Sequence, residues 1–307
     1  MSERDRIGLL AAIFGSGQVP VGIGDDAAVH EGGLVWTVDA QIEETHFRRA
    51  WVSWHDVGFR SFMAAASDLA AMGAQPIGAL SALALPDDVD DAAFTAIVEG
   101  QAEASRAVGA PIVGGNLARG REASITTTLL GRCERPLLRS GARPRDGVWV
   151  AGGLGMAAAG LAALQVGGDL LQNTSVQTCI DTWRRPRALV ETGLGIAGAS
   201  AGADVSDGLS RDAANIAEAS GVCIVLDELQ LRDLAAGALT VVAEGLQRDP
   251  LDFVLGGGED YALLVTSPTP LPGFVRIGYV VVGEGIALLR PDGSTARLEP
   301  RGYDHFR

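Results

Sequence analysis

The 307-residue sequence contains no lysine, and all 24 of its lysine-plus-arginine residues are arginines. A P-loop needs a lysine beside its glycine-rich turn, and Schiff-base chemistry needs a lysine amine, so both are excluded. A lysine clamp on the γ-phosphate of a nucleotide is excluded for the same reason. If this protein handles phosphate, metal ions and arginines must neutralise the charge.

Cysteine and long apolar runs are also scarce. The three cysteines have unrelated spacings and form no Cys-x-x-Cys motif, so we expect buried free thiols in a reducing compartment. They are Cys133, Cys179 and Cys223. Residues 1–6 are charged and precede only a short apolar stretch, which predicts neither a signal peptide nor an anchor. The apolar run at 150–164 is interrupted by glycines and is too short to span a membrane. These features predict a cytoplasmic protein without a membrane partner.

The bulk composition describes a packed, acidic protein. Hydrophobic residues make up 47% of the chain and charged residues 20%, which is typical of a globular fold. The length fits two domains of ordinary size. A formal charge of −14 argues against nucleic acid as a partner, because binding to a phosphate backbone requires a basic surface. An acidic protein can still bind an anionic nucleotide when cations lie between them.

Acidic residues recur inside short turns rich in glycine and serine. These turns are Gly24-Asp25-Asp26, Val38-Asp39, Ser67-Asp68 and Asp204-Val205-Ser206-Asp207-Gly208. A tight turn presents a carboxylate without bulky neighbours, and Mg²⁺ prefers oxygen ligands. Each turn alone is equally typical of a helix cap or a β-turn. Asp25-Asp26 is the hardest to explain in that way, because adjacent carboxylates repel unless a cation or solvent screens them.

The order of elements predicts an α/β or α+β protein with two domains, residues 1–138 and 139–307. For the first half we expect a strand at 34–38 that opens into a loop at Asp39, a helix at 54–72, a strand at 77–85, a helix at 91–108 and a strand at 124–131. For the second half we expect a strand at 148–151, a helix at 156–164, a strand that ends at Asp204, a helix at 211–219, strands at 223–226, 261–266 and 275–282, and a hairpin that turns at Pro291-Asp292-Gly293. The polar stretch 139–147 marks the boundary.

Two glycine motifs are similar to known signatures but have simpler explanations. Gly153-Leu154-Gly155 follows a predicted strand and opens a helix, as a dinucleotide fingerprint does. No regular strand–helix–strand follows to deliver an acidic residue to a ribose, so close packing is favoured. Gly198-Ala199-Ser200-Ala201-Gly202 matches a nucleophile elbow, but it follows a helix and precedes a strand, which is the reverse of the required order.

Taken in order, the acidic turns and several further motifs resemble the thiamine-monophosphate kinase family. The further motifs are His46-Phe47, Gly114-Gly115-Asn116, Gly257-Gly258-Glu259-Asp260-Tyr261 and Gly302-Tyr303-Asp304-His305-Phe306. The resemblance spans nearly the whole chain and places it in the aminoimidazole ribonucleotide synthetase superfamily. It implies an N-terminal α/β domain whose sheet pairs with its twin in a homodimer, and a C-terminal α/β domain that completes the active site.

The resemblance also implies an activity. In this family, ATP phosphorylates thiamine monophosphate to thiamine diphosphate, and the γ-phosphoryl group passes directly to the substrate phosphate. Two unit like charges about 4 Å apart repel by roughly 4 kcal/mol at an effective dielectric of 20, so two polyanions need several Mg²⁺ ions between them. No side chain need act as nucleophile, because the substrate supplies its own phosphate oxygen.

The resemblance implies a role for each motif residue. The metal ligands would be Asp26, Thr37, Asp39, Asp68, Asp204 and Asp207, with Val38 contributing its backbone at most and Asn116 standing where a carboxylate is usual. ATP would be held by Gly115, Asn116, Arg139 and Ser206. Thiamine monophosphate would be contacted by His46, Glu259 and Tyr303. From the residues alone, Arg139 is suited to phosphate because a guanidinium grips two oxygens at once.

Three positions depart from the family pattern and keep alternatives open. Asn116 brings no charge to a metal, Val38 replaces a usual threonine, and Ala262 replaces a polar or acidic residue. The alternatives are another ATP-using enzyme of the superfamily, such as aminoimidazole ribonucleotide synthetase, or a nucleotide-binding homologue with impaired catalysis. The identity of the bound substrate and the formation of product discriminate between these alternatives.

Overall fold

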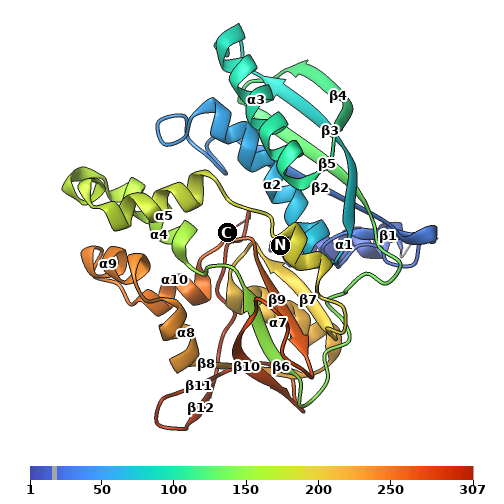
Figure 1. Cartoon of the computed structure of the whole chain (residues 1–307), viewed down its shortest axis with the longest axis vertical. Coiled ribbons are helices and arrows are strands. Elements are labelled where there is room, and N and C mark those ends of the chain that lie inside the picture. The colour runs from blue at the N-terminus through green and yellow to red at the C-terminus, as the bar shows by residue number, and fades with distance from the viewer. Residues whose placement is uncertain (16–18, 307) are drawn as a thin grey trace.

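The computed structural model describes residues 1–15 and 19–306, which form two β-sheets with helices around and between them (Figure 1). The first half contains α1 Glu3–Phe14, β1 Ala28–His30, the 3-10 helix η1 Glu31–Gly33, β2 Leu34–Ile42, α2 Trp54–Ala71, β3 Gln75–Leu85, α3 Asp91–Val108, β4 Ile112–Arg119 and β5 Ser124–Arg132. The second half contains β6 Gly147–Ala151, α4 Met156–Val166, the 3-10 helix η2 Gly168–Gln172, α5 Thr174–Arg184, α6 Val190–Leu194, β7 Ala201–Val205, α7 Leu209–Ser220, β8 Cys223–Asp227, α8 Glu228–Leu234, α9 Ala238–Gly245, α10 Pro250–Gly256, β9 Ala262–Ser267, β10 Val275–Val281, β11 Gly285–Leu289 and β12 Thr295–Arg297. Among the described residues, no helix is both long and apolar enough to cross a membrane.

The first sheet has the strand order β1-β2-β5-β3-β4 and is antiparallel except for the pair β3 and β4. Side chains alternate between its two faces. The inner face carries buried residues such as Val35 and Leu129 and packs against α2. The outer face carries Trp36, Val38 and Leu80, whose side chains are about half exposed. This chain therefore leaves an apolar sheet face uncovered.

Helix α2 lies between the two sheets and is buried on nearly every side. Its apolar residues do not form a single stripe, which is typical of a helix with protein all around it. It contacts β2 and β5 of the first sheet and β7 and β9 of the second. Glycines let α3 cross it closely: a Cβ added to Gly58 would lie 2.0 Å from the Ile97 carbonyl oxygen, and one added to Gly100 would lie 1.9 Å from that of His55.

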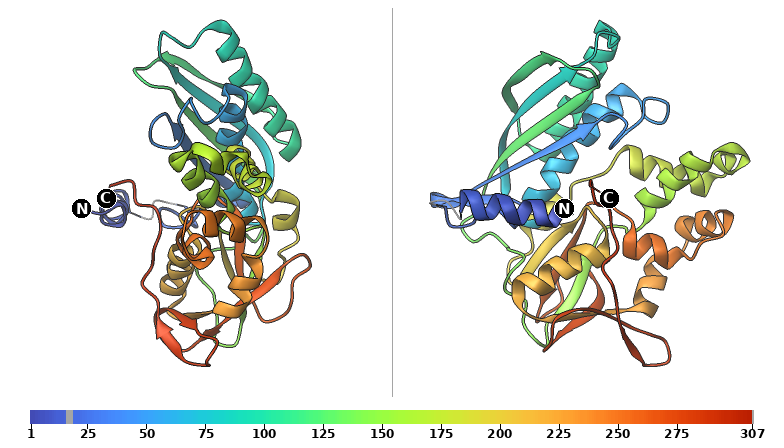
Figure 2. Two further views of the ribbon diagram at one scale, coloured as in Figure 1. Left: turned by 90° about the vertical axis from the view of Figure 1, so that its left-hand side faces the viewer. Right: turned by 180° about the vertical axis from the view of Figure 1, so that it is seen from behind.

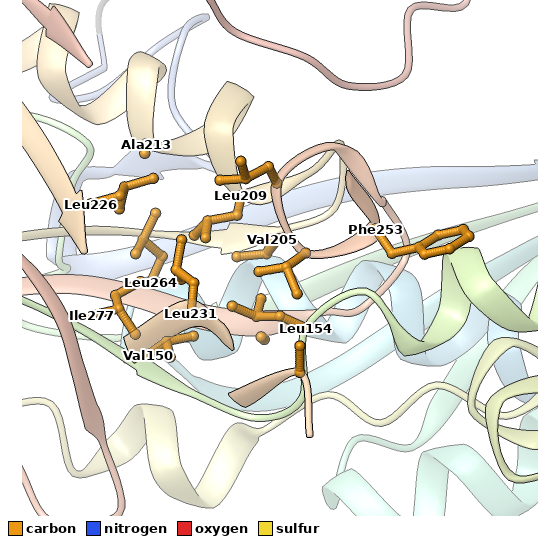
Figure 3. Close-up of a cluster of buried hydrophobic side chains, with 14 of the residues drawn as sticks. Val150, Leu154, Val205, Leu209, Ala213, Leu226, Leu231, Phe253, Leu264 and Ile277 are labelled. Atoms are coloured by element: carbon orange, nitrogen blue, oxygen red, sulfur yellow. The ribbon is translucent and has the colours of Figure 1, made fainter. Parts of the chain in front are cut away.

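The second sheet has the order β12-β11-β8-β10-β6-β9-β7, with a parallel pair between β11 and β8. Its core is shown in Figure 3, where Val150, Val205 and Leu264 from three strands meet Leu209 and Ala213 from α7. Strand β7 is buried along its whole length. Its carboxyl end delivers Asp204 and the turn that follows, so the core fixes the position of that turn.

Most predicted elements are confirmed, and three details are corrected. Strand β2 does not end at Asp39 but continues to Ile42, because Asp39 pairs with Thr127 of β5. Several elements were not predicted: strands β1 and β4 and helices α1, α5, α6, α8, α9 and α10. All three cysteines are free, but only Cys179 is buried; Cys133 and Cys223 are half-buried because they lie at strand ends.

The two ends of the described chain lie side by side (Figure 2). Helix α1 starts with a capping box, in which Ser2 and Asp5 exchange hydrogen bonds. The Arg6 guanidinium lies 3.9 Å from the centre of the Phe306 ring. The amino-terminal helix thus contacts the C-terminal segment that borders the site described next.

Candidate active site

A cavity of about 720 Å³ is lined by both halves of the chain. The first half contributes β2, α2 and the segment 44–51, and the second half contributes α4, the turn 204–207, the segment 257–261 and the C-terminal segment. Eight residues predicted for the site line this cavity: Asp39, His46, Asp68, Asp204, Ser206, Asp207, Glu259 and Tyr303. The structure therefore gathers residues from motifs more than 250 positions apart.

Asp26 and Arg139 form a buried ion pair close to the cavity residues. Asp26 Oδ1 accepts hydrogen bonds from Arg139 Nε at 2.9 Å and Nη2 at 2.5 Å, whereas Oδ2 is buried without a described partner. The pKa of Asp26 is raised to about 7, mainly by burial and also by the charge of Asp204, against the opposing effect of Arg139. The adjacent Asp25 accepts the backbone N–H of Arg139 at 3.1 Å. The paired aspartates thus hold one arginine, and one carboxylate oxygen remains unused.

Asp68 and Asp204 bring the two halves together at the end of α2. Thr37 Oγ1 donates to Asp68, and Ser67 Oγ donates to Asp204 Oδ2 at 2.6 Å. Ser206 Oγ donates to the other oxygen of Asp204 at 3.2 Å. Burial raises the pKa of Asp68 well above its usual value and that of Asp204 to about 6, and neighbouring carboxylates add to both shifts. The hydrogen bonds from these hydroxyl groups therefore stabilise the negative charges of Asp68 and Asp204 only in part.

Asp39 and Asp207 complete the acidic wall. Asp39 lies on the inner face of β2, and burial raises its pKa to about 6. Asp207 follows β7 and is the more exposed of the two; Arg211 Nε lies 3.3 Å from its Oδ2. Gly208 after it has a φ of 129°, a conformation that favours glycine, and it begins α7. The turn thus directs the Asp207 side chain toward the cavity, whereas α7 runs away from the cavity.

The segment 257–261 crosses the cavity in an unusual backbone conformation. A Cβ on Gly257 would lie 2.3 Å from the Phe253 carbonyl oxygen, and one on Gly258 would lie 2.5 Å from that of Ser206. Asp260 accepts the N–H groups of Gly155 at 2.5 Å and Ala157 at 3.2 Å, at the amino-terminal end of α4. The two glycines of Gly153-Leu154-Gly155 therefore belong to a packed helix start, which agrees with the packing interpretation of that motif.

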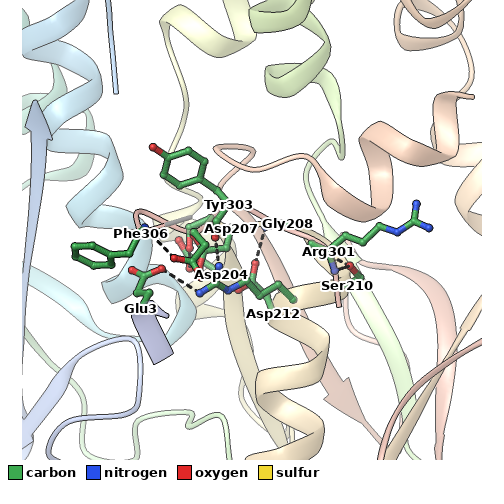
Figure 4. Close-up of polar contacts among 12 residues, drawn as sticks. Glu3, Asp204, Asp207, Gly208, Ser210, Asp212, Arg301, Tyr303 and Phe306 are labelled. Carbon is green, nitrogen blue, oxygen red and sulfur yellow. Dashed lines mark hydrogen bonds and ion pairs between the residues drawn. The ribbon is translucent and has the colours of Figure 1, made fainter. Parts of the chain in front are cut away.

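The C-terminal segment closes one side of the cavity. The ring centres of His46 and His305 are 5.1 Å apart, and those of Tyr303 and His305 are 4.8 Å apart. Tyr303 N–H donates to the Asp207 carbonyl oxygen at 3.1 Å, and Arg211 donates to the Tyr303 carbonyl oxygen. Arg211 also contacts Glu3 of α1 at 3.0 Å (Figure 4). Burial lowers the pKa of His46, so its ring is held neutral next to these aromatic groups.

Six predicted residues are not among those that line this cavity. Asp26, Thr37 and Arg139 lie beside it, since Thr37 contacts Asp68 and Arg139 contacts Asp26. The other three lie farther from the acidic cluster. The Val38 side chain points to the outer face of the first sheet. Gly115 and Asn116 lie in β4 and line a second cavity of about 620 Å³ against α3. Asn116 is paired in register with Ala82, on the outer face, whereas Asp39 and Asp68 meet on the inner face. Within one chain, Asn116 is therefore separated from the acidic cluster by the sheet.

The oxygen ligands at this site fit a hard cation that takes its remaining ligands from water or phosphate. Within residues 1–15 and 19–306, no three His, Cys, Asp or Glu side chains form a complete metal site. Mg²⁺ commonly binds one or two carboxylates and takes its remaining ligands from water and phosphate. The unpartnered Oδ2 of Asp26 and the buried carboxylates of Asp68 and Asp204 are suited to that arrangement.

The raised pKa values predict that the metal-free protein loses stability as pH rises from 5 to 7.5. Asp26, Asp39 and Asp204 have pKa values of about 7, 6 and 6 when folded and 3.8 when unfolded, so the folded state retains protons that the unfolded state releases. Each pKa unit is about 1.4 kcal/mol, so the free energy of unfolding should fall by several kcal/mol. The lowered pKa of His46 has the opposite effect on the pH dependence of stability, but His46 is one group against these three aspartates.

Urea denaturation in a chelator at both pH values measures this dependence. The Asp26→Asn variant serves as control, and its free energy of unfolding should change less with pH than that of the unmodified protein. A stability that stays level or rises over this range would contradict the burial of these charges.

Comparison with known proteins agrees with the fold. The fold is that of the AIR synthase related proteins, and the family described as AIR synthase related protein, N-terminal domain, matches residues 24–133. The thiamine-monophosphate kinase of Mycobacterium tuberculosis strain H37Rv is 37% identical over 286 residues, which cover 88% of this chain and 82% of that protein. That of Aquifex aeolicus strain VF5 is 34% identical over 294 residues, which cover 92% of each. The structure of AaThiL complexed with AMPPCP and TMP matches with a TM-score of 0.89 at 32% identity, over 99% of this chain and 97% of that chain. The chain belongs to the thiamine-monophosphate kinase family.

Several residues at the cavity were missed by sequence reasoning. Trp183, His305 and Gln41 line it, and Arg60 and Arg211 hold residues that do. Arg60 carried a signal, since it is the one basic residue in the largely apolar stretch 57–66. Trp183 and Gln41 carried none, because nothing in their local sequence distinguishes them from core residues.

Proposed function

We propose that this chain transfers the γ-phosphoryl group of ATP directly to the phosphate of thiamine monophosphate, which yields thiamine diphosphate and ADP. The observation that carries the proposal is the cluster of buried carboxylates in and beside one cavity, Asp26, Asp39, Asp68 and Asp204, in a chain without lysine. Such a cluster is stable in its charged form only with cations, and a phosphoryl transfer between two polyanions needs the same cations.

Mg²⁺ would be held by Asp26, Thr37, Asp39, Asp68, Asp204 and Asp207. When bound, it would screen the charges of the two phosphate chains and of the transferring group. The side chains themselves position these ligands: Thr37 and Ser67 orient the carboxylates by donating hydroxyl hydrogens, and Arg139 neutralises Asp26. No protein group forms a covalent intermediate in this proposal.

Arg139 and Ser206 are proposed to bind the ATP phosphates, and His46, Glu259 and Tyr303 the thiamine moiety and its phosphate. His46 and Tyr303 present aromatic rings, which suit contact with an aromatic cation. Glu259 contributes a carboxylate that can accept hydrogen from an amino group. No cavity residue carries a lysine amine that would compete for the phosphate.

Gly115 and Asn116 are proposed to reach ATP across a homodimer. The exposed Trp36, Val38 and Leu80 form an apolar face that a partner could cover, and the register of Asn116 with Ala82 places Asn116 on that same face. A second copy that covers this face would place Asn116 at the subunit boundary. This arrangement accounts for a nucleotide-binding motif that lies outside the acidic cavity of its own chain.

Two further assignments remain proposals. The domain division at residues 138 and 139 is supported by the gap between β5, which ends at Arg132, and β6, which starts at Gly147. A cytoplasmic location is proposed from the free thiols and the absence of a long apolar run in the sequence. Neither assignment affects the chemistry of the site.

The proposed function predicts that ADP and thiamine diphosphate appear together when the purified protein receives ATP, Mg²⁺ and thiamine monophosphate. Both products should vanish on chelation of the metal and return when excess Mg²⁺ is added. Thiamine without a phosphate serves as a control acceptor and should give no thiamine diphosphate. ATP binding without product would instead favour the nucleotide-binding homologue, and turnover of formylglycinamidine ribotide would favour the synthetase alternative.

A further inference from the structure

Arg60 is a basic side chain buried in the middle of α2, with 1% of its surface exposed. Its Nε donates to Gln41 Oε1 at 3.0 Å and its Nη1 to the Trp183 carbonyl oxygen at 3.0 Å. Its Nη2 donates to Glu259 Oε1. One guanidinium therefore joins β2, α5 and the 257–261 segment. Gln41, Trp183 and Glu259 line the large cavity, whereas Arg60 itself does not.

Arg60 and Trp183 fix the carboxylate of Glu259 from both sides. Glu259 Oε1 accepts from Arg60, and Oε2 accepts from the indole Nε1 of Trp183 at 2.7 Å. The guanidinium also lies 4.6 Å from the centre of the Trp183 ring. The Glu259 carboxylate, the Arg60 guanidinium and the Trp183 indole thus contact one another, and the guanidinium balances the charge of the carboxylate.

The backbone of Glu259 is held independently of this set. Glu259 and Tyr261 have φ values of 62° and 50°, in the left-handed region that side-chain-bearing residues rarely adopt. Their N–H groups donate to the carbonyl oxygens of Ser206 at 2.8 Å and Val205 at 2.9 Å. Because β7 anchors the backbone, the contribution left to Arg60 is the direction and the charge of the Glu259 side chain.

We propose that Arg60 is a positioning residue for thiamine monophosphate, which it serves through Glu259 and Trp183 without touching the substrate; the inference rests on the proposed function. With its charge neutralised, Glu259 recognises a hydrogen-bond donor, such as an amino group on an aromatic ring, through its remaining lone pairs. Trp183 is itself buried, with 1% of its surface exposed, so it acts through its hydrogen bond to Glu259 and not by contact with the substrate. Without Arg60, Glu259 would be a half-buried free anion able to turn toward the cations of the acidic cluster.

The test is Arg60→Lys. A lysine ammonium keeps the charge but cannot direct a planar fork to three acceptors. Loss of one or two hydrogen bonds to a charged group should raise the KM for thiamine monophosphate about tenfold, with the KM for ATP and kcat changed less than twofold. Arg185→Lys is the matched control: Arg185 also binds two carboxylates, Asp56 and Glu103, and stacks on a ring, Phe59, but lies outside the cavity. It should leave both KM values unchanged.

A second variant separates positioning from a structural role. In a Glu259→Gln background, Arg60→Gln leaves no unpaired buried charge, so it tests the inference even if Arg60→Lys fails to fold. Its KM for thiamine monophosphate should equal that of Glu259→Gln alone, because Arg60 then has no carboxylate through which to act. A further rise in KM, or a folded Arg60→Lys protein with wild-type KM, would overturn the inference alone. A wild-type protein that makes no thiamine diphosphate would overturn the proposed function and this inference with it.

Discussion

Replacing Asp68 with asparagine should reduce phosphoryl transfer by at least about a hundredfold, the scale on which one preorganised electrostatic group contributes to catalysis. Asp68 is buried among other carboxylates, and its charge is offset in this chain by little more than the hydroxyl of Thr37. Asparagine keeps the shape and can still accept from Thr37, but it removes the charge that a cation requires. Initial rates of thiamine diphosphate formation at saturating ATP and Mg²⁺ measure the effect.

The folded state should not suffer from this change. Burial and neighbouring charges raise the pKa of Asp68 well above its usual value, so ionised Asp68 destabilises the metal-free fold at neutral pH. Asp68→Asn should therefore unfold at the same or a higher temperature than the unmodified protein. Asp207→Asn should lose activity as well, whereas Asp181→Asn, the same change at an exposed carboxylate on α5, should not. Near-normal turnover by a folded Asp68→Asn protein would exclude the proposed metal site.

Mixing two inactive variants should restore activity if Asn116 serves the partner's site. A large residue at position 116, as in Asn116→Trp, should block one subunit's contribution, and Asp68→Asn should disable the acidic cluster of the other. In a heterodimer, one of the two sites then combines an intact Asp68 with an intact Asn116. Random exchange of subunits would give about a quarter of the wild-type rate. The measurement is the rate after the two variants are unfolded together and refolded.

The control for this experiment is a mixture in which both changes lie on one chain and the other chain is unmodified. In that heterodimer, Asp68→Asn disables one site and Asn116→Trp disables the other. The control mixture should therefore show only the activity of the wild-type homodimers that it contains. No recovery in the first mixture, together with activity in the control above that of its wild-type homodimers and with dimers confirmed by sedimentation, would show that Asn116 acts within its own chain and not across the interface. A monomeric protein would contradict the proposed homodimer directly.

The elements that the sequence predicted best are those with strong local signals. Helix α3 begins after Asp90, which caps it, and ends at Gly109 in the left-handed conformation, so both of its boundaries were predictable. Strand β4 was missed because Gly114 and Gly115 weaken its local preference, and it forms only by pairing with β3. Helix α1 was missed although Ser2 and Asp5 had the spacing of a capping box.

The family assignment was predictable because it depends on the order of many short motifs, and it is confirmed by relatives that cover most of the chain. The convergence of the acidic turns on one cavity could not be derived from spacing, because it depends on α2 and β7 meeting in space. The separation of Asn116 from Asp68 was also hidden, since it follows from the register of β3 and β4. The contacts of Arg60 could not be predicted for another reason: its three hydrogen-bond partners lie in segments far apart in the sequence.

The position of α2 between the sheets has a consequence for how the molecule unfolds. Its inner residues share one core with Leu129 of the first sheet and with Ala151 and Leu263 of the second. Neither half can lose its sheet without exposing this helix, and a cut at residue 138 would divide the core that surrounds the helix. Although the sheets are separate in sequence, the helix couples their stabilities, so we expect the two halves to unfold together rather than in turn.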